Sequence, residues 1–129
     1  MDLSLKTESF TQGNQSWLGS AHGTDTARSV TLDTSAFTAG THYPAGFFLS
    51  GLPIAKITAT GKYGPYDDAA VDGRAVLAGF LFEAVKAPSV NTVDPNGALL
   101  MHGFVVESKL PIAVDAAGKA DVKGSLIFV

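Results

Sequence analysis

Residues 43–87 restrict the fold more than any other segment, because two apolar runs there enclose a stretch rich in turn-forming residues. The runs, residues 47–60 and 76–86, are rich in β-branched and aromatic residues, which favour extended strands. Residues 61–68 (GKYGPYDD) combine Gly, Pro and Asp, which are typical of turns. The segment therefore predicts a β scaffold around a hinge, and it contains no arrangement of side chains suited to catalysis.

The second run is expected to form the most buried strand. In an extended chain Phe80 and Phe82 face one side while Leu81 and Val85 face the other, so both faces are apolar. A helix is the alternative, but a glycine and two phenylalanines disfavour it. The run therefore predicts a central strand of the sheet.

The remaining chain also has a β pattern. Short alternating or apolar segments predict further strands at residues 30–34, 47–50, 54–60, 98–109 and 125–129. Gly103 is expected to mark a bend or bulge, and Asp115 to cap one helical turn. With 129 residues, the sequence predicts one compact, mainly β domain with a small sandwich or barrel-like core and at most one or two short helical turns.

Residues 1–28 differ from the rest and are expected to form an extended, flexible N-terminal arm before a β-rich domain at 29–129. Polar and small residues dominate, no helical or strand period persists, and the apolar side chains are isolated. Such a segment orders only when another surface covers its apolar residues. That surface could belong to a partner or to the domain itself, which would make the segment a strap; a floppy tail is the third possibility.

Composition excludes several classes of protein. The net charge is −3 and the nine Lys and Arg are scattered, so we expect no nucleic-acid partner. Cysteine is absent, and the longest apolar run is far shorter than the ~20 residues that span a bilayer, so we expect neither disulfides nor a membrane. Nothing at the start of the sequence resembles a signal peptide, which predicts synthesis in a cytoplasm. Only 16% of residues are charged, which favours an assembly that covers part of the surface.

No motif predicts chemistry. His22, His42 and His102 lie in separate segments without metal-ligand spacing. The acidic group Asp67, Asp68 and Asp72 lacks the ligand pattern of a calcium loop and is expected to serve turns. No serine lies in a nucleophile elbow and no glycine-rich loop matches a phosphate fingerprint. We therefore expect no catalytic residue, no metal and no cofactor, and not an enzyme.

The order of five short segments carries a resemblance to a known family. They are VTLDT (30–34), GTHYPAG (40–46), GLPIAKI (51–57), KYGPYD (62–67) and DGRAVLAGFLF (72–82), followed by the apolar C-terminal strand. In this order the chain resembles the head decoration (capsid cement) proteins of tailed bacteriophages, the lambda-type family in its broad sense, and most of all those of actinobacterial phages. The resemblance covers most of residues 29–129, and the arm matches in character only.

The resemblance implies a homotrimer on the outer surface of the virion, bound to the major capsid protein around local three-fold axes. In that family an N-terminal arm orders on the shell, often by adding a strand to a capsid sheet. The residues expected to contact the capsid are Leu3, Leu5, Phe10 and Trp17. The residues expected at the trimer interface are Tyr63, Pro65, Tyr66, Ile127 and Val129.

Two other classes remain open from the sequence. A carbohydrate- or receptor-binding β module would use the aromatic residues of the turns as a stacking platform. A small β-rich enzyme would need titratable residues that converge in a pocket, which the scattered histidines disfavour.

Overall fold

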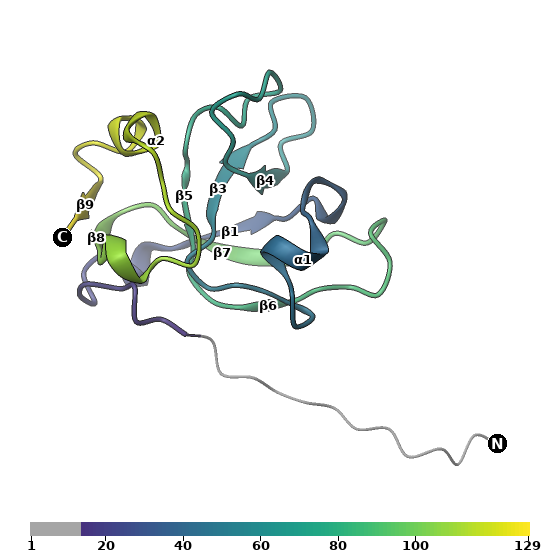
Figure 1. Ribbon diagram of the computed structural model, residues 1–129, viewed down its shortest axis with the longest axis horizontal. Helices are drawn as coiled ribbons and strands as arrows, with labels where there is room; N and C mark the ends of the chain where they lie inside the picture. Colours follow the sequence, from purple (N-terminus) through teal and green to yellow (C-terminus); the bar gives the residue numbers. More distant parts are fainter. Residues whose placement is uncertain (1–13) are drawn as a thin grey trace, which may run out of the picture.

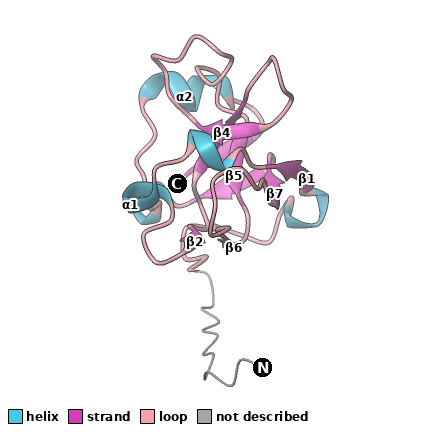
Figure 2. Ribbon diagram, turned by 90° about the vertical axis from the view of Figure 1, so that its right-hand side faces the viewer, coloured by secondary structure: helices cyan, strands magenta, loops and turns pink. Residues whose placement is uncertain are grey.

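The computed structural model describes residues 14–129, which form a mainly β domain (Figure 1). The strands of this part of the chain are β1 (Arg28–Thr31), β2 (Phe47–Phe48), β3 (Pro53–Lys56), β4 (Tyr63–Pro65), β5 (Gly79–Leu81), β6 (Val85–Lys86), β7 (Asn96–Leu100), β8 (Gly103–Val105) and β9 (Leu126–Phe128). The helices are α1 (Ala39–His42), α2 (Ala116–Asp121) and the 3-10 turns η1 (Thr24–Thr26), η2 (Thr34–Ala36) and η3 (Glu107–Lys109). Short strands and short helices confirm the predicted fold class. Figure 2 shows them linked by long loops.

The main sheet has five antiparallel strands in the order β1-β7-β5-β3-β4. The central strand is β5, in which Phe80 and Leu81 are fully buried, and this confirms the expected position of the second apolar run. The run does not continue as one strand, however, because β6 leaves the sheet and pairs with β2. The segment expected to be only a hinge contains β4, which pairs with β3 through Gly64 opposite Ala55.

The two edge strands of the main sheet meet at one end, which gives the sheet a barrel-like curl. Leu32, just after β1, forms a parallel bridge with Tyr63 of β4. The Asp33 N–H donates to the Tyr63 carbonyl at 2.8 Å. Such a junction pairs edge groups that would otherwise stay open to solvent.

The C-terminal strand is held in a second, smaller sheet. β9 runs parallel to β8, with Ile127 opposite Phe104. Gly103 begins β8 at a φ of 142°, and the chain bends between β7 and β8, as the sequence predicts at this glycine. The expected strand over residues 98–109 is therefore two strands in two different sheets.

Helix α2 begins as the sequence predicts. Asp115 lies at its N-cap, where one carboxylate oxygen accepts a hydrogen bond from the Gly118 N–H at 2.8 Å. The same oxygen accepts from the Tyr66 hydroxyl at 2.8 Å, so the cap also ties α2 to the residue after β4.

Two groups of buried side chains form the core. The terminal cluster comprises Trp17, Leu77, Phe80, Leu100, Val105, Val114, Val122 and Leu126. The barrel cluster comprises Leu32, Phe37, Phe48, Leu52, Ile54, Leu81 and Leu99. Phe80 and Leu81 are adjacent in β5 and point to opposite faces, so this strand separates the two clusters.

Candidate functional site

The N-terminal strap, residues 14–27, lies on the domain and is fastened by Trp17. The Trp17 side chain is fully buried in the terminal cluster, and its ring lies 5.8 Å from that of Phe80 between centroids. The expectation that Trp17 contacts a capsid is therefore wrong, because its side chain is part of the protein's own core. Burying a side chain of this size gives a large hydrophobic stabilisation, which explains why the polar segment around it is held. Leu3, Leu5 and Phe10 lie outside the described residues.

Polar contacts hold the strap beside Trp17. The indole N–H donates to the Ser50 hydroxyl at 3.0 Å, and that hydroxyl donates to the Phe82 carbonyl at 2.7 Å. The Gln15 amide donates to the same carbonyl at 2.8 Å. Gly51, at a φ of 89°, allows the approach, since a Cβ there would lie 2.9 Å from the Trp17 ring. The buried polar atoms of Trp17 and Ser50 are thus satisfied.

The strap also adds backbone pairing to the edge of β8. Leu18 forms an antiparallel bridge with Val105. The Val106 N–H donates to the Trp17 carbonyl at 2.6 Å, and the Gly19 N–H donates to the Phe104 carbonyl at 2.9 Å. This pairing fixes Trp17, Leu18 and Gly19 at the edge of β8.

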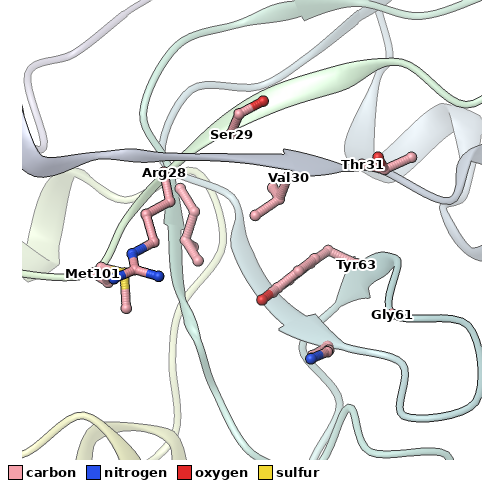
Figure 3. A pocket seen from close by; sticks show the side chains of 9 residues that line it. Arg28, Ser29, Val30, Thr31, Gly61, Tyr63 and Met101 are labelled. Carbon is pink, nitrogen blue, oxygen red and sulfur yellow. The ribbon is translucent and has the colours of Figure 1, made fainter.

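A pocket of about 370 Å³ lies between the diverging strands β1 and β4 (Figure 3). Its lining residues are Arg28, Ser29, Val30, Thr31, Lys56, Gly61, Tyr63, Leu99 and Met101. In Figure 3 the side chains of Arg28 and Met101 lie at one end and Tyr63 at the other, with Val30 pointing into the space between them. The pocket ends where Leu32 bridges Tyr63 and closes the curl of the sheet.

The lining of this pocket combines two cations with backbone of the β1 edge. Arg28 and Lys56 are exposed, and the lining includes no carboxylate. Just after β1, the Leu32 N–H donates to the Pro95 carbonyl on the side of β7. The next N–H, that of Asp33, donates to the Tyr63 carbonyl on the side of β4. Successive residues of a strand turn their peptide groups to opposite sides. The peptide groups of Ser29 and Thr31 therefore point away from β7 and towards the pocket, in the same direction as that of Asp33. The pocket therefore suits an extended or polyhydroxylated ligand, and its cations favour negative charge.

The five residues expected at a trimer interface lie in different parts of the domain, and two of them, Tyr63 and Tyr66, pack on different clusters. Tyr63 is half-buried in edge strand β4 and packs on the barrel cluster. Tyr66 packs on the terminal cluster, and burial together with the Asp115 carboxylate raises the pKa of its hydroxyl. Ile127 and Val129 are 50% and 64% exposed beside β8. Pro65 ends β4 and is half-buried.

The structure brings together two histidines that the sequence places in separate segments. His22 Nε2 of the strap lies 3.1 Å from His102 Nδ1 in the turn between β7 and β8. His42 is elsewhere: its Nδ1 accepts from the Thr38 N–H at 2.8 Å, and burial lowers its pKa. Sequence reasoning missed the pair because 80 residues separate its members and only the strap's path joins them.

The acidic residues of the 67–72 loop serve turns and one ion pair. An Asp67 carboxylate oxygen accepts from the Ala69 N–H, and Asp72 pairs with the Arg74 guanidinium at 3.0 Å. The Arg74 hydrogen bond holds the pKa of Asp72 below its usual range. Within residues 14–129 no group of three or more His, Asp or Glu is placed to hold a metal ion. In the same part of the chain no helix is long and apolar enough to cross a membrane.

No protein-family model matches the sequence, and no curated protein is significantly similar to it.

Proposed function

We propose that the protein is a capsid decoration protein, which binds the outer surface of an assembled, expanded phage head as a homotrimer and stabilises it by clamping major capsid protein subunits. The proposal rests on the order of sequence segments described above. The observation that carries it furthest is the strap itself, which is anchored to a small β domain at Trp17 and follows a segment with isolated apolar residues.

The N-terminal region has two parts, which meet at Trp17. From Trp17 onward the chain belongs to the domain, because that residue is buried and its carbonyl is paired with β8. Before it, Leu3 and Leu5 alternate with polar residues, a pattern that suits addition of a strand to a partner's sheet. The proposed capsid contacts are therefore narrowed to Leu3, Leu5 and Phe10.

Clamping follows from geometry and mass action. Three N-terminal segments on one trimer bind with a high effective concentration once the first has engaged, so weak single contacts combine into firm attachment. A ligand that binds the expanded lattice and not its dissociated subunits stabilises the lattice by mass action. The trimer contacts proposed from the sequence, Tyr63, Pro65, Tyr66, Ile127 and Val129, all retain some exposed surface.

Deleting residues 2–13 tests the proposal without disturbing Trp17. We expect the shortened protein to remain folded and trimeric by light scattering, and to lose at least tenfold in co-sedimentation with expanded empty heads of its phage. A matched pair sharpens the result: Leu3→Ser with Leu5→Ser and Phe10→Ser should lose binding, whereas Ser4→Ala with Thr7→Ala should keep it. Unchanged binding by the deletion variant would exclude the N-terminal segment as the contact. A full-length monomer indifferent to heads would exclude decoration altogether.

A second candidate function rests on the pocket between β1 and β4. Tyr63 offers an aromatic face, Arg28 and Lys56 offer charged donors, and the edge of β1 offers the peptide groups of Ser29 and Thr31. This combination suits an acidic carbohydrate, in which ring faces stack and hydroxyl or carboxyl groups accept hydrogen bonds.

Binding to a glycan array distinguishes this second function. The carbohydrate function predicts a protein that binds acidic glycans, loses them in the Tyr63→Ala variant and keeps them when residues 2–13 are removed. The decoration function predicts instead that removing residues 2–13 abolishes binding to expanded heads. Absence of any glycan signal above that of Tyr63→Ala would exclude the carbohydrate function.

A further inference from the structure

His22 and His102 meet at the surface, where the strap passes the turn between β7 and β8. Their facing nitrogens, His22 Nε2 and His102 Nδ1, are 3.1 Å apart, and the ring centroids are 4.9 Å apart with the planes tilted by 54°. Both side chains are exposed, so solvent reaches the space beside the two nitrogens.

Backbone packing, rather than the imidazoles alone, holds the two histidines together. Gly23 follows His22 at a φ of 80° and lies directly against the His102 carbonyl. Gly103 follows His102, and a Cβ on it would lie 2.5 Å from the His22 carbonyl oxygen. A side chain at either glycine would collide with the opposite backbone. Phe104 adds an edge contact to the His22 ring, with centroids 6.0 Å apart. The pair is thus preorganised by the fold.

We propose that His22 and His102 form a two-histidine site for a divalent transition-metal ion of the Zn²⁺, Ni²⁺ or Cu²⁺ class, which clips the strap to the β7–β8 turn. Imidazole nitrogen is a preferred ligand of these ions. An ion at the usual 2.0–2.1 Å from each nitrogen, with the 3.1 Å separation, subtends an angle of about 100° between them. That angle lies between square-planar and tetrahedral values, and water fills the remaining positions on the exposed side.

Metal binding needs only a choice of tautomer. In the direct hydrogen bond one of the two facing nitrogens carries the hydrogen and the other accepts it. With both rings neutral and their hydrogens on the far nitrogens, His22 Nδ1 and His102 Nε2, both facing lone pairs are available to the ion. Since the two residues are 80 positions apart, the unfolded chain does not present them as a chelate. The ion therefore binds the folded state preferentially and raises its stability.

Calorimetry on the tag-free, full-length, metal-stripped protein tests the site, with ZnCl₂ and NiCl₂ as the probes at pH 7.5. We expect one ion per chain, and a loss of at least tenfold in affinity in both His22→Ala and His102→Ala. The matched control is His42→Asn, because His42 is the one histidine of the sequence outside the pair. Asn Oδ1 can still accept the hydrogen bond from the Thr38 N–H. At a hundredfold excess of metal over Kd, the melting temperature should rise by about 5 °C or more in the natural protein and in His42→Asn, and much less in the two alanine variants.

Nitrogen-15 spectra of the histidines give a second readout that does not depend on affinity. Coordination should shift His22 Nε2 and His102 Nδ1 and leave the two nitrogens of His42 unchanged. The proposal is overturned if no saturable binding occurs, if only one of the two alanine variants loses affinity, or if His42→Asn loses as much as they do. None of these results depends on capsid binding, so the site can fail or stand independently of the proposed function.

Discussion

The terminal and barrel clusters are parts of one core, but they are assembled from the chain in different ways. The barrel cluster draws on residues between 32 and 99, mostly from antiparallel strands. The terminal cluster draws on residues from 17 to 126, and it depends on the strap and on the parallel pair β8–β9. Figure 1 shows this division, with the purple strap and the yellow C-terminal segments gathered on the same side of the domain.

The difference predicts unequal local stability. Joining residues far apart in the chain costs more loop-closure entropy than joining near neighbours. The free energy of local opening is therefore expected to be lower for the terminal cluster than for the barrel cluster. We expect the terminal cluster to open first. The same opening would detach the strap, residues 14–27, from β8.

The largest expected effect is that of Trp17→Ala. Removing a fully buried indole should cost about 3–5 kcal/mol in the free energy of unfolding. Hydrogen exchange should quicken most at the Gly19 and Val106 amides, which pair strap and β8, and least at the Ala78 amide, which donates to Ile54 beside the barrel. Urea unfolding followed by circular dichroism gives the stability, and mass spectrometry gives the exchange.

Trp17→Phe is the control for this comparison. It keeps an aromatic ring in the terminal cluster but removes the hydrogen bond to Ser50, so we expect a smaller loss than with alanine. Equal acceleration of exchange at all three amides in Trp17→Ala would show that the two clusters unfold as one unit, and the proposed difference between them would be wrong.

Two glycines in helices provide a more moderate test. Alanine normally stabilises a helix relative to glycine by about 1 kcal/mol. In α2, however, a Cβ on Gly118 would lie 2.6 Å from Val114 Cγ1 and 3.0 Å from the Tyr66 ring. We expect Gly118→Ala to destabilise by about 1–3 kcal/mol, as other overpacked sites do. Thermal unfolding measures the change.

Gly40 in α1 is the matched position beside the barrel, since nothing lies within 4 Å of a Cβ built there. Gly40→Ala should be neutral or stabilising by up to about 1 kcal/mol. A stabilising Gly118→Ala would mean that the space between α2 and Tyr66 adapts, and that the terminal cluster is less tightly packed than the structure indicates.

Local signals in the sequence were sufficient for several elements. The two-sided apolar pattern around Phe80 and Leu81 predicts a central strand because no other position buries both faces. Asp115 predicts a helix start because its carboxylate can accept the orphan N–H groups of the first turn. Both predictions depend on groups within a few residues of one another.

The predictions that failed depend on long-range pairing. Trp17 looked like a residue available to a partner, since nothing near it in the sequence reveals Ser50 or Phe80 as its neighbours. Residues 63–65 looked like a turn, because Gly and Pro obscure a strand that only pairing with Ala55 and Leu32–Asp33 creates. The His22–His102 pair and the pocket at Arg28 were missed for the same reason.

The smallest expected effect is the pH dependence of Asp94→Asn, at the closure of the barrel. The Asp94 carboxylate accepts from Lys62 Nζ at 2.6 Å and from the Thr34 N–H at 3.1 Å. The hydrogen bond from Lys62 is the main cause that lowers the pKa of Asp94, and in turn it raises the pKa of Lys62. The terminal side has the comparable ion pair Lys119–Glu107, in which both side chains are more than one-third exposed.

The sign of the effect follows from the direction of the shift. A carboxyl whose folded pKa is depressed contributes stability that is full above its unfolded pKa, about 3.9, and is lost as the pH falls through the lower folded pKa. Asn keeps an acceptor for Thr34 but has no charge, so Asp94→Asn should lower the melting temperature by a few degrees at most at pH 7, and the difference should shrink towards pH 3. Glu107→Gln should change it little at either pH, since an exposed pair with one partner contributes little. A loss in Asp94→Asn that is equal at pH 3 and pH 7 would assign the effect to shape rather than charge. In that case the hydrogen bond from the Asp33 N–H to the Tyr63 carbonyl would close the barrel without help from the Lys62–Asp94 ion pair.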